Sequence, residues 1–294
     1  MADNPRLGFI ALASTIVCYG TLWASAKMSL AYVPPLWFTA GRFAIGGLFV
    51  VAVLIAQGRF RLPPKQDIPV VLSVGVVMLG AYSSIFQTAL QYVHAGRASI
   101  LGYTTTVFVT PIAVAFLGER LTRLRLAGLV AAVAGLMALF NPAELDWSDA
   151  DAVRGNAMLI LCALLWSAVI LHLRVHRQQA DTLQLAPWQL LAAFVVAMVS
   201  AVAIEGPPTF RLGAHALGYY LYGGIFATGL GIWGVTTTFR NLPTAISTVG
   251  LLGVPVVALV ISVLFLGEML TVWLGAGLLL IVGGIAAVTL SRAD

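Results

Sequence analysis

A heptapeptide that occurs twice is the feature that most constrains this chain. Residues 116–122 read FLGERLT and residues 265–271 read FLGEMLT, so six of seven positions agree at an offset of 149. The same offset pairs glycines outside the heptapeptide: Gly75 with Gly224, Gly80 with Gly229, Gly128 with Gly277 and Gly135 with Gly284. A period of this length is too long for a solenoid and indicates a duplicated half-protein. We therefore expect two equivalent helical bundles.

The composition places both bundles in a membrane. Hydrophobic residues make up 60% of the chain and charged residues 9%, whereas charged residues are roughly a quarter of a soluble domain. The apolar runs are about 20 residues long, the length that a helix needs to cross about 30 Å of hydrocarbon. We predict an all-α integral membrane protein with ten transmembrane helices near residues 7–30, 35–56, 68–91, 95–118, 122–140, 155–176, 183–204, 214–239, 243–266 and 270–290.

One long polar segment, residues 141–154, separates the fifth predicted helix from the sixth. It divides the chain into a first repeat, residues 1–141, and a second repeat, residues 155–292. Because each half holds five helices, an odd number, the second half enters the membrane from the opposite face, and the repeat is inverted. Inverted repeats supply the two exchangeable conformations that alternating access requires, and they place a substrate site at their interface near the bilayer midplane.

Positive charge is distributed unevenly between the two predicted faces. The face that holds the N-terminus collects eleven basic residues, and the other face has four, namely Lys27, Arg97, Arg154 and Arg211. Because Lys and Arg accumulate in cytoplasmic loops, both termini are predicted to be cytoplasmic, in a multi-pass protein of the bacterial inner membrane. The net charge of +5 is therefore attributed to topology rather than to nucleic-acid binding.

The Gly-Glu-x-Leu-Thr ending of both heptapeptides, set in two halves of five helices, resembles the EamA family of the drug/metabolite transporter (DMT) superfamily. The resemblance covers essentially the whole chain and implies the DMT/EamA fold. Within that family the chain is most similar to the YddG-type amino acid exporters, which implies export of aromatic or neutral amino acids through an aromatic-lined cavity. The implied partners are a small-molecule substrate and the lipid bilayer. A monomer can be functional, and the sequence does not give the oligomeric state.

Polar and aromatic side chains form stripes on the first, third, fourth, sixth, eighth and ninth predicted helices. Polar residues inside a membrane are costly and commonly face a cavity, although a hydroxyl can instead bond to its own backbone one turn earlier. The candidate substrate-binding residues are Tyr19, Trp23, Arg42, Tyr82, Ser84, Gln87, Tyr103, Thr106, Trp166, Trp233 and Thr248.

Arg42 is the charge that lies deepest in a predicted helix. It stands about seven residues from the helix start, or roughly 10 Å below the surface at ~1.5 Å per residue. A charge at mid-membrane costs about 2.5 to 3.5 kcal/mol on insertion scales, so Arg42 is expected to be paired or to snorkel. Lys27 is a candidate to lie beside it and help to hold a substrate carboxylate. The alternative is that both cations are solvated and snorkel outward.

Prolines and glutamates mark the two related helices, the fourth and the ninth. Pro111 and Pro255 interrupt them, five positions apart on the repeat alignment, and each is a candidate hinge or a structural kink. Glu119 and Glu268 lie at the helix ends and are expected to cap the turns into the fifth and tenth helices.

No motif points to an enzyme, a cofactor or a bound metal. His94 and His172 belong to no cluster with metal-ligand spacing, and the phosphate-binding and hydrolase motifs are absent from the sequence. The alternatives are a drug efflux protein, a sugar-phosphate or nucleotide-sugar exchanger, which needs two or more buried basic residues, and, from another class, a channel. Because no acidic residue falls at mid-membrane and His172 is the one intramembrane proton carrier in view, we expect facilitated diffusion rather than proton coupling.

Overall fold

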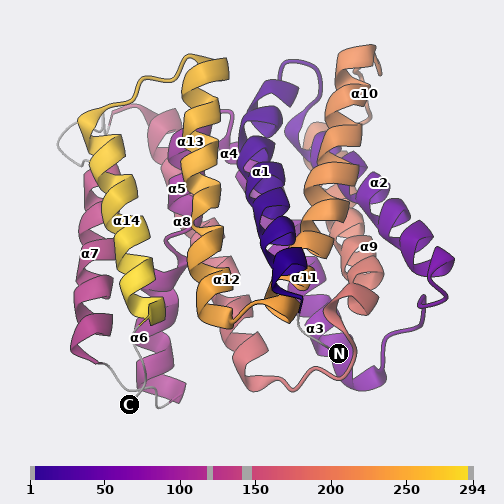
Figure 1. Ribbon diagram of the computed structural model, residues 1–294. Helices are drawn as coiled ribbons and strands as arrows, with labels where there is room; N and C mark the ends of the chain where they lie inside the picture. The colour runs from indigo at the N-terminus through magenta and orange to yellow at the C-terminus, as the bar shows by residue number, and fades with distance from the viewer. Residues whose placement is uncertain (1–3, 118–121, 141–147, 291–294) are drawn as a thin grey trace.

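The computed structural model describes residues 4–117, 122–140 and 148–290 (Figure 1). These residues form helices and connecting turns with no strand, which confirms the all-α prediction. The elements in chain order are α1 (Pro5–Ser29), α2 (Pro35–Ala56), η1 (Lys65–Asp67), α3 (Ile68–Leu72), η2 (Ser73–Ala81), α4 (Tyr82–Ala89), α5 (Ala95–Gly102), α6 (Thr105–Leu117), α7 (Arg123–Phe140), α8 (Ala150–Val175), α9 (Thr182–Ser200), η3 (Ala201–Glu205), α10 (Ala214–Leu221), η4 (Tyr222–Leu230), α11 (Gly231–Asn241), α12 (Thr244–Leu251), α13 (Gly253–Leu266) and α14 (Val272–Leu290).

Several of these elements join end to end into longer rods. η1, α3, η2 and α4 follow one another without a gap, as do α9 with η3, and α10 with η4 and α11. Seven stretches among the described residues are long and apolar enough to cross a membrane: Pro5–Ser29, Pro35–Ala56, Lys65–Ala89, Ala150–Val175, Thr182–Glu205, Ile246–Leu266 and Val272–Leu290. The rod formed by α10, η4 and α11 is not among them because glycine, tyrosine and threonine dilute its apolar residues. A chain of this kind crosses a membrane several times.

Two π-helical segments, η2 and η4, occupy positions that differ by the repeat offset of 149. Each contains two of the repeated glycines. A Cβ atom on Gly75 would lie 2.7 Å from the carbonyl oxygen of Gln189 on α9, and one on Gly224 would lie 2.6 Å from Cγ2 of Ile45 on α2. The repeated glycines therefore let each π-helical segment press against a neighbouring helix.

Two helices that were predicted to be continuous are each broken. α5 and α6 are separated at Tyr103 and Thr104, and α12 and α13 are separated at Leu252. Tyr103 and Leu252 are themselves 149 positions apart, so the breaks are repeat partners. The prediction that the helices are interrupted at Pro111 and Pro255 was wrong, because neither break lies at a proline. Pro255 is in the first turn of α13, where its missing N–H costs nothing, whereas Pro111 lies inside α6.

α7 and α14, the last helix of each half, pack against each other through glycines. A Cβ atom on Gly128 would lie 2.6 Å from the carbonyl oxygen of Gly284, and one on Gly135 would lie 2.9 Å from that of Gly277. The repeat pairs Gly128 with Gly277 and Gly135 with Gly284, so it converts each of these contacts into the other. A two-fold axis between the helices would do the same. Small residues let two helix backbones approach closely within a bilayer, where packing replaces the hydrophobic effect.

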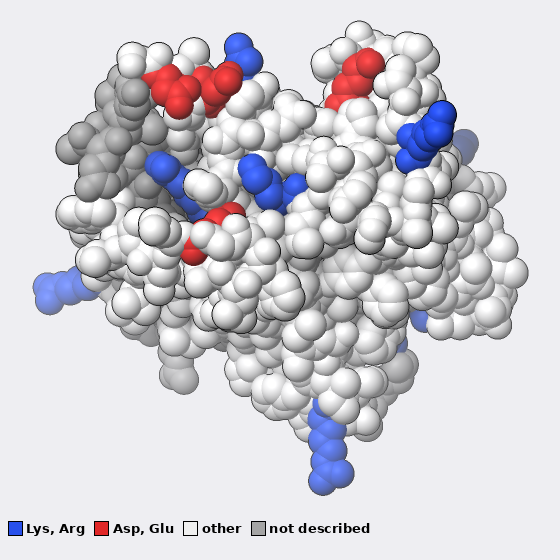
Figure 2. All heavy atoms as spheres, turned by 90° about the horizontal axis from the view of Figure 1, so that it is seen from above, with Lys and Arg blue, Asp and Glu red and all other residues white. Residues whose placement is uncertain are grey.

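The two halves begin with helices that run in opposite directions. Lys27, near the end of α1, donates from Nζ to the carbonyl oxygen of Val93 at 3.1 Å, and the guanidinium of Arg154, near the start of α8, lies 5.6 Å from the ring centroid of Tyr92. Both residues therefore reach the turn between α4 and α5 from helices of opposite sense. Figure 1 shows that α1 begins and α14 ends at the bottom of the molecule. We name this the terminal end and the opposite one, viewed in Figure 2, the distal end.

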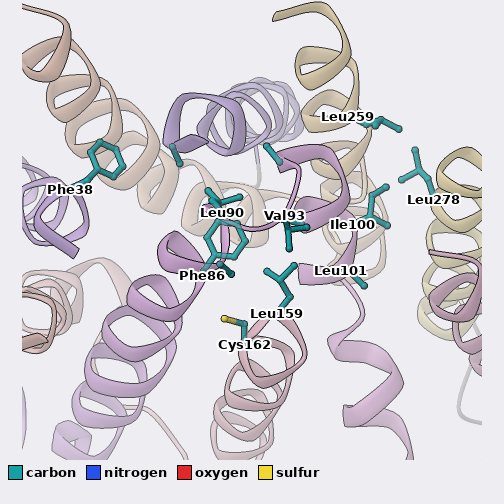
Figure 3. Packing of buried hydrophobic residues seen from close by; sticks show 14 of the residues in the cluster. Phe38, Phe86, Leu90, Val93, Ile100, Leu101, Leu159, Cys162, Leu259 and Leu278 are labelled. Atoms are coloured by element: carbon teal, nitrogen blue, oxygen red, sulfur yellow. The ribbon is translucent and has the colours of Figure 1, made fainter. Parts of the chain in front are cut away.

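The largest apolar core fills the distal half of the molecule. Figure 3 shows Phe86, Leu90 and Val93 of the α4 region meeting Leu159 and Cys162 of α8. Ile100 and Leu101 of α5, Leu259 of α13 and Leu278 of α14 continue the same cluster. α5 packs directly on α13 within this core. Among the described residues, the related helices α6 and α12 at the terminal end show no comparable contact.

Candidate functional site

The interior between α1, α2, the η2–α4 rod and the break in the fourth predicted helix brings together four of the predicted site residues. The guanidinium of Arg42 interacts electrostatically with the phenol groups of Tyr19 and Tyr82, and Tyr103 does so with both tyrosines. All four side chains keep part of their surface accessible. Tyr103 occupies its position because the helix breaks there. The structure thus places one cation and three phenols close enough to interact electrostatically.

A group of packed aromatic rings, the aromatic wall, lies next to these side chains on the distal side. The ring of Trp23 meets that of Phe86 edge-on with centroids 4.5 Å apart, Tyr82 stacks on Phe86 at 5.8 Å, and Tyr82 and Trp166 lie 4.9 Å apart. A Cβ atom on Gly102 would lie 2.9 Å from Cη2 of Trp23 and 3.3 Å from the hydroxyl of Tyr82. Glycine at the end of α5 is therefore needed for the rings of Trp23 and Tyr82 to pack against that helix. Pairs of this kind each contribute about 0.5 to 1.5 kcal/mol beyond area burial.

Arg42 has neither an acidic partner nor a hydrogen bond among the described residues. Its Nε atom is buried without a hydrogen-bond partner, and the guanidinium lies 4.6 Å from the ring centroid of the adjacent Phe43. The Cγ and Cδ atoms of its stem lie against Gly223, where a Cβ atom would approach to 3.1 and 3.0 Å. A buried cation of this kind is costly unless an anion compensates it. The arrangement can therefore accept a carboxylate.

Four other predicted site residues lie elsewhere or make structural contacts. Gln87 donates from Nε2 to the carbonyl oxygen of Ala26 at 2.8 Å and so ties α4 to α1. Ser84 is buried beside it on α4 with no hydrogen bond for its hydroxyl, and Thr248 is half-buried on α12. The side chain of Thr106 lies outside the described residues.

Trp233 lines a separate groove of about 190 Å³ between α2, α9 and α11. Its other walls are Phe49, Val50, Val53, Gln57, Leu183, Gly229 and Leu230. The groove is apolar apart from Gln57, at the end of α2 that lies toward the terminal end. Sequence reasoning placed Trp233 with the other aromatics because its helix carries a polar stripe, and that stripe does not reveal which neighbour the ring faces.

Lys27 does not accompany Arg42, contrary to one of the two predictions made for it. Its Nζ atom donates to the carbonyl oxygens of Leu90 and Val93, which end α4 and begin the following turn. A cation at this place satisfies carbonyls that have no partner within the helix and complements the helix dipole.

The glutamate of the second heptapeptide also has a role that differs from the prediction. Glu268 does not cap α14, since the hydroxyl of Thr271 accepts from the N–H of Leu274 there at 3.1 Å. The carboxylate of Glu268 instead accepts from the N–H groups of Ala95 and Gly96 at 2.7 and 3.0 Å, at the start of α5. Thr122 caps α7 in the same way as Thr271 caps α14. Glu119 lies outside the described residues.

Sequence reasoning missed three features of the site: Phe86, Gly102 and the π-helical segment that precedes Tyr82. Phe86 lies one turn after Tyr82 and was hidden among apolar residues. The residue one repeat offset after Gly102 is Leu251, so the pairing of glycines between the halves did not mark Gly102. The pairs of repeated glycines in η2 and η4 were the available signal for the π-helical segments, because close backbone approach is the physical reason to retain glycine in a membrane helix.

The profile of the EamA-like transporter family matches residues 6–141 and 153–290. The chain belongs to this family. The match confirms the predicted resemblance and the prediction of a membrane transporter rather than an enzyme. A transporter of this kind has a small-molecule substrate and works in a lipid bilayer.

Relatives of the chain carry transporter names. It is 26% identical over 276 residues to the uncharacterized transporter YoaV of Bacillus subtilis, with 94% of each chain covered. It is 27% identical over 293 residues to a "Probable amino-acid metabolite efflux pump" of Salmonella typhimurium, covering 95% of this chain and 93% of that one. It is 29% identical over 270 residues to a "Probable terminal-alkyne amino-acid exporter" of Streptantibioticus cattleyicolor, covering 88% and 85%.

A solved structure also resembles the fold. A crystal structure of a protein 24% identical in sequence superposes with a TM-score of 0.70, and the match covers 98% of this chain and 99% of that one. This similarity extends over the whole chain and concerns the fold alone.

Proposed function

We propose that this EamA transporter exports small organic metabolites, in the first place aromatic or neutral amino acids, across the inner membrane by alternating access. Two relatives named for amino-acid efflux support the substrate class. The opposite directions of α1 and α8, the paired π-helical segments and the exchanged glycine contacts of α7 and α14 support two inverted repeats. In this proposal the repeats are residues 1–141 and 155–292, and each contributes five of ten membrane-spanning helices.

The observation that carries the substrate proposal is the unpaired guanidinium of Arg42 facing Tyr19 and Tyr82. A substrate carboxylate compensates the charge that the fold leaves unpaired, and charge-assisted hydrogen bonds of this type are about twice as strong as neutral ones. The wall formed by Trp23, Tyr82 and Trp166 offers ring faces to a flat or apolar side chain. One carboxylate and one apolar side chain describe an amino acid better than they describe a cationic drug.

The same residues weigh against the alternatives. A sugar-phosphate or nucleotide-sugar exchanger needs at least two buried cations for its phosphate groups, and Lys27 is engaged by the carbonyl oxygens of Leu90 and Val93. A channel needs a continuous pore, whereas the distal half is filled by an apolar core. Drug efflux stays open as the second candidate because an aromatic wall also suits an apolar drug. The orientation that we propose, with both termini cytoplasmic, puts the distal end outside the cell.

Transport assays in proteoliposomes test the substrate proposal. Vesicles loaded with radiolabelled phenylalanine should release it at a rate well above empty vesicles, while phenethylamine, which lacks the carboxylate, should leave at the background rate. Arg42→Gln should slow phenylalanine release about tenfold or more, since a hydrogen bond to a charged group contributes about 1.5 to 3 kcal/mol. Trp273→Ala, on the half-exposed face of α14, is the matched control and should leave the rate unchanged. Equal release of the acid and the amine would refute the carboxylate site.

A further inference from the structure

The turn between α4 and α5, residues 90–94, is held from two sides by opposite charges. Lys27 of α1 donates to the carbonyl oxygens of Leu90 and Val93, and Glu268, just beyond α13, accepts from the N–H groups of Ala95 and Gly96. The cation thus meets the carboxyl end of one helix and the anion meets the amino end of the next, which is the favourable order for both helix dipoles. We call Lys27, Glu268 and this turn the distal clamp.

The carboxylate of the distal clamp is buried and closely fitted. Glu268 is 7% exposed. A Cβ atom on Gly96 would lie 2.8 Å from Oε2 of Glu268 and 2.9 Å from Cδ1 of Leu259, so glycine is needed for the carboxylate to reach the backbone. The imidazole of His94 lies 3.8 Å from the same carboxylate, at the exposed side of the turn. Figure 2 shows that the distal end is otherwise mostly uncharged, with few basic and acidic side chains in view.

The distal clamp lies where α5 meets its neighbouring helices. α5 packs on α13 and on α1 here, whereas the described residues of α6 and α12, the repeat partners of α13 and α5, show no comparable contact at the terminal end. Two inverted halves of related fold exchange conformations by exchanging which end is closed. The contact of α5 with α13, which the described residues of α6 and α12 do not match, is therefore the one that must break.

We propose that the distal clamp locks the outer gate, and that the carboxylate of Glu268 must leave the N–H groups of Ala95 and Gly96 before a substrate can exit on the distal side. This inference rests on the alternating access of the proposed function, but it does not depend on which substrate is carried. Breaking the clamp favours the outward-open conformation because the closed one loses two charge-assisted hydrogen bonds.

A thiol reporter measures the opening of the distal end without any substrate. Ser99 is fully buried on α5, on the helix face that places Gly96 against α13 and Gly102 against Trp23. We would introduce Ser99→Cys, which is nearly isosteric, after replacing Cys18 and Cys162 by alanine. The rate of modification by a charged, membrane-impermeant methanethiosulfonate, added outside intact cells, then reports how often the seam opens outward.

Glu268→Gln should raise this rate about tenfold, since the amide retains one acceptor and loses the charge. Lys27→Met, which loosens the clamp from the other side, should raise it severalfold and guards against a folding defect peculiar to one variant. The matched control is Glu205→Gln. Glu205 accepts from the N–H groups of Leu36 and Trp37 at 2.9 and 3.2 Å, with the same chemistry at the same end, but it joins α2 to η3. The thiol modification rate in Glu205→Gln should equal that of the parent.

Two outcomes would overturn the proposal. A modification rate in Glu268→Gln and Lys27→Met within twofold of the parent, for protein that is monodisperse in detergent, would show that the clamp does not hold the gate. An equal increase in Glu205→Gln would show that any lost cap loosens the distal end. If the variants are labelled as expected but the parent protein does not transport amino acids, the substrate proposal is refuted and the distal clamp is supported.

Discussion

The distal and terminal ends are built from related sequences and packed differently. α5 and α12 are eight-residue helices that lie one repeat offset apart in the sequence. Each is the first part of a broken helix, and the second part is α6 or α13 respectively. At the distal end α5 lies on α13 under a buried glutamate. At the terminal end the described residues of the corresponding pair are not in comparable contact. The two pairs of helices share their lengths and their places in the repeat, and we interpret the difference in packing as a difference of state.

One of the differences in sequence between α5 and α12 bears directly on this difference in packing. The position related to Gly96 is Ala245. At Gly96 an added methyl group would meet Glu268 and Leu259, so the distal contact is closer than an alanine allows. Small asymmetries of this kind set which of two nearly equivalent conformations has the lower free energy, and a gap of a few kcal/mol is enough to populate one of them. In the orientation proposed above, with both termini cytoplasmic, we therefore interpret the structure as the conformation that is closed at its outer, distal end.

The largest effect should come from locking the distal end. The Cβ atom of Ser262 on α13 lies 3.4 Å from the position that a Cβ atom on Gly96 would take, close to the 3.5 to 4.5 Å usual for disulfides. A Cβ atom at residue 96 displaces the carboxylate of Glu268, but the disulfide itself then holds α5 on α13. In a background without Cys18 and Cys162, the pair Gly96→Cys and Ser262→Cys should therefore cross-link and abolish export, because the outer gate cannot open. A reducing agent should restore transport.

The single variant Ser262→Cys is the control for this prediction and should transport with or without oxidant. Gel mobility after cleavage between the two helices verifies the cross-link. Undiminished transport by the fully cross-linked protein would show that α5 and α13 do not separate, and the comparison of the two ends would lose its functional meaning.

A smaller effect is expected in the aromatic wall beneath the closed end. Trp166→Ala or Tyr82→Ala removes one ring from a stacked group, and ring contacts contribute about 0.5 to 1.5 kcal/mol beyond area burial. Transport should fall severalfold at unchanged expression. Trp273→Ala, on α14, is the control. If all three variants lose activity equally, the wall is not where the substrate binds.

Much of the fold follows from the sequence because its causes are local or periodic. The length of each apolar run fixes how far a helix extends, and the offset of 149 locates the partner of every element, including the π-helical segments and the breaks at Tyr103 and Leu252. The sequence identified the repeated glycines, but it did not show which helices they pack against. Gly128 and Gly277 became intelligible only when α7 and α14 were seen to pack together.

The site was less predictable because it depends on which helix faces which. Tyr19, Tyr82 and Tyr103 were chosen from stripes on separate helices and Arg42 for its depth in the second predicted helix, and the structure brings the four together. Trp233 came from the same argument and lines a different groove. Glu268 was expected to cap the turn into the tenth helix, and Lys27 to lie beside Arg42 or to snorkel outward, whereas each reaches across to another element. A sequence shows that a charge lies at a helix end, but a partner about 170 residues away, such as Ala95 for Glu268, is set by tertiary packing.

The threonine caps offer a comparison in which the two ends should behave alike. Thr122 and Thr271 accept from the N–H groups of Arg125 and Leu274 at 3.2 and 3.1 Å. Loss of such a cap costs about 1 kcal/mol, and its effect is local. Thr122→Ala and Thr271→Ala should therefore lower the thermal stability in detergent by similar small amounts and leave thiol labelling at the distal end unchanged. A much larger loss for one of them would mean that the caps also report the state of the gate.

The smallest effect is expected from a pH gradient, and it concerns the terminal end. Titratable groups gather there: Nδ1 of His172 lies 2.8 Å from the hydroxyl of Ser73, and His176 lies 3.7 Å from the buried Asp67. Asp67 is already satisfied by the N–H groups of Gln179 and Ala180 at 3.0 and 2.8 Å, so it needs no proton to remain buried. In proteoliposomes with equal substrate on both sides, an imposed pH step should cause no net movement, and His172→Ala should behave like the parent. Uphill accumulation that disappears in His172→Ala would instead establish proton coupling and make the terminal end an energy-transducing site.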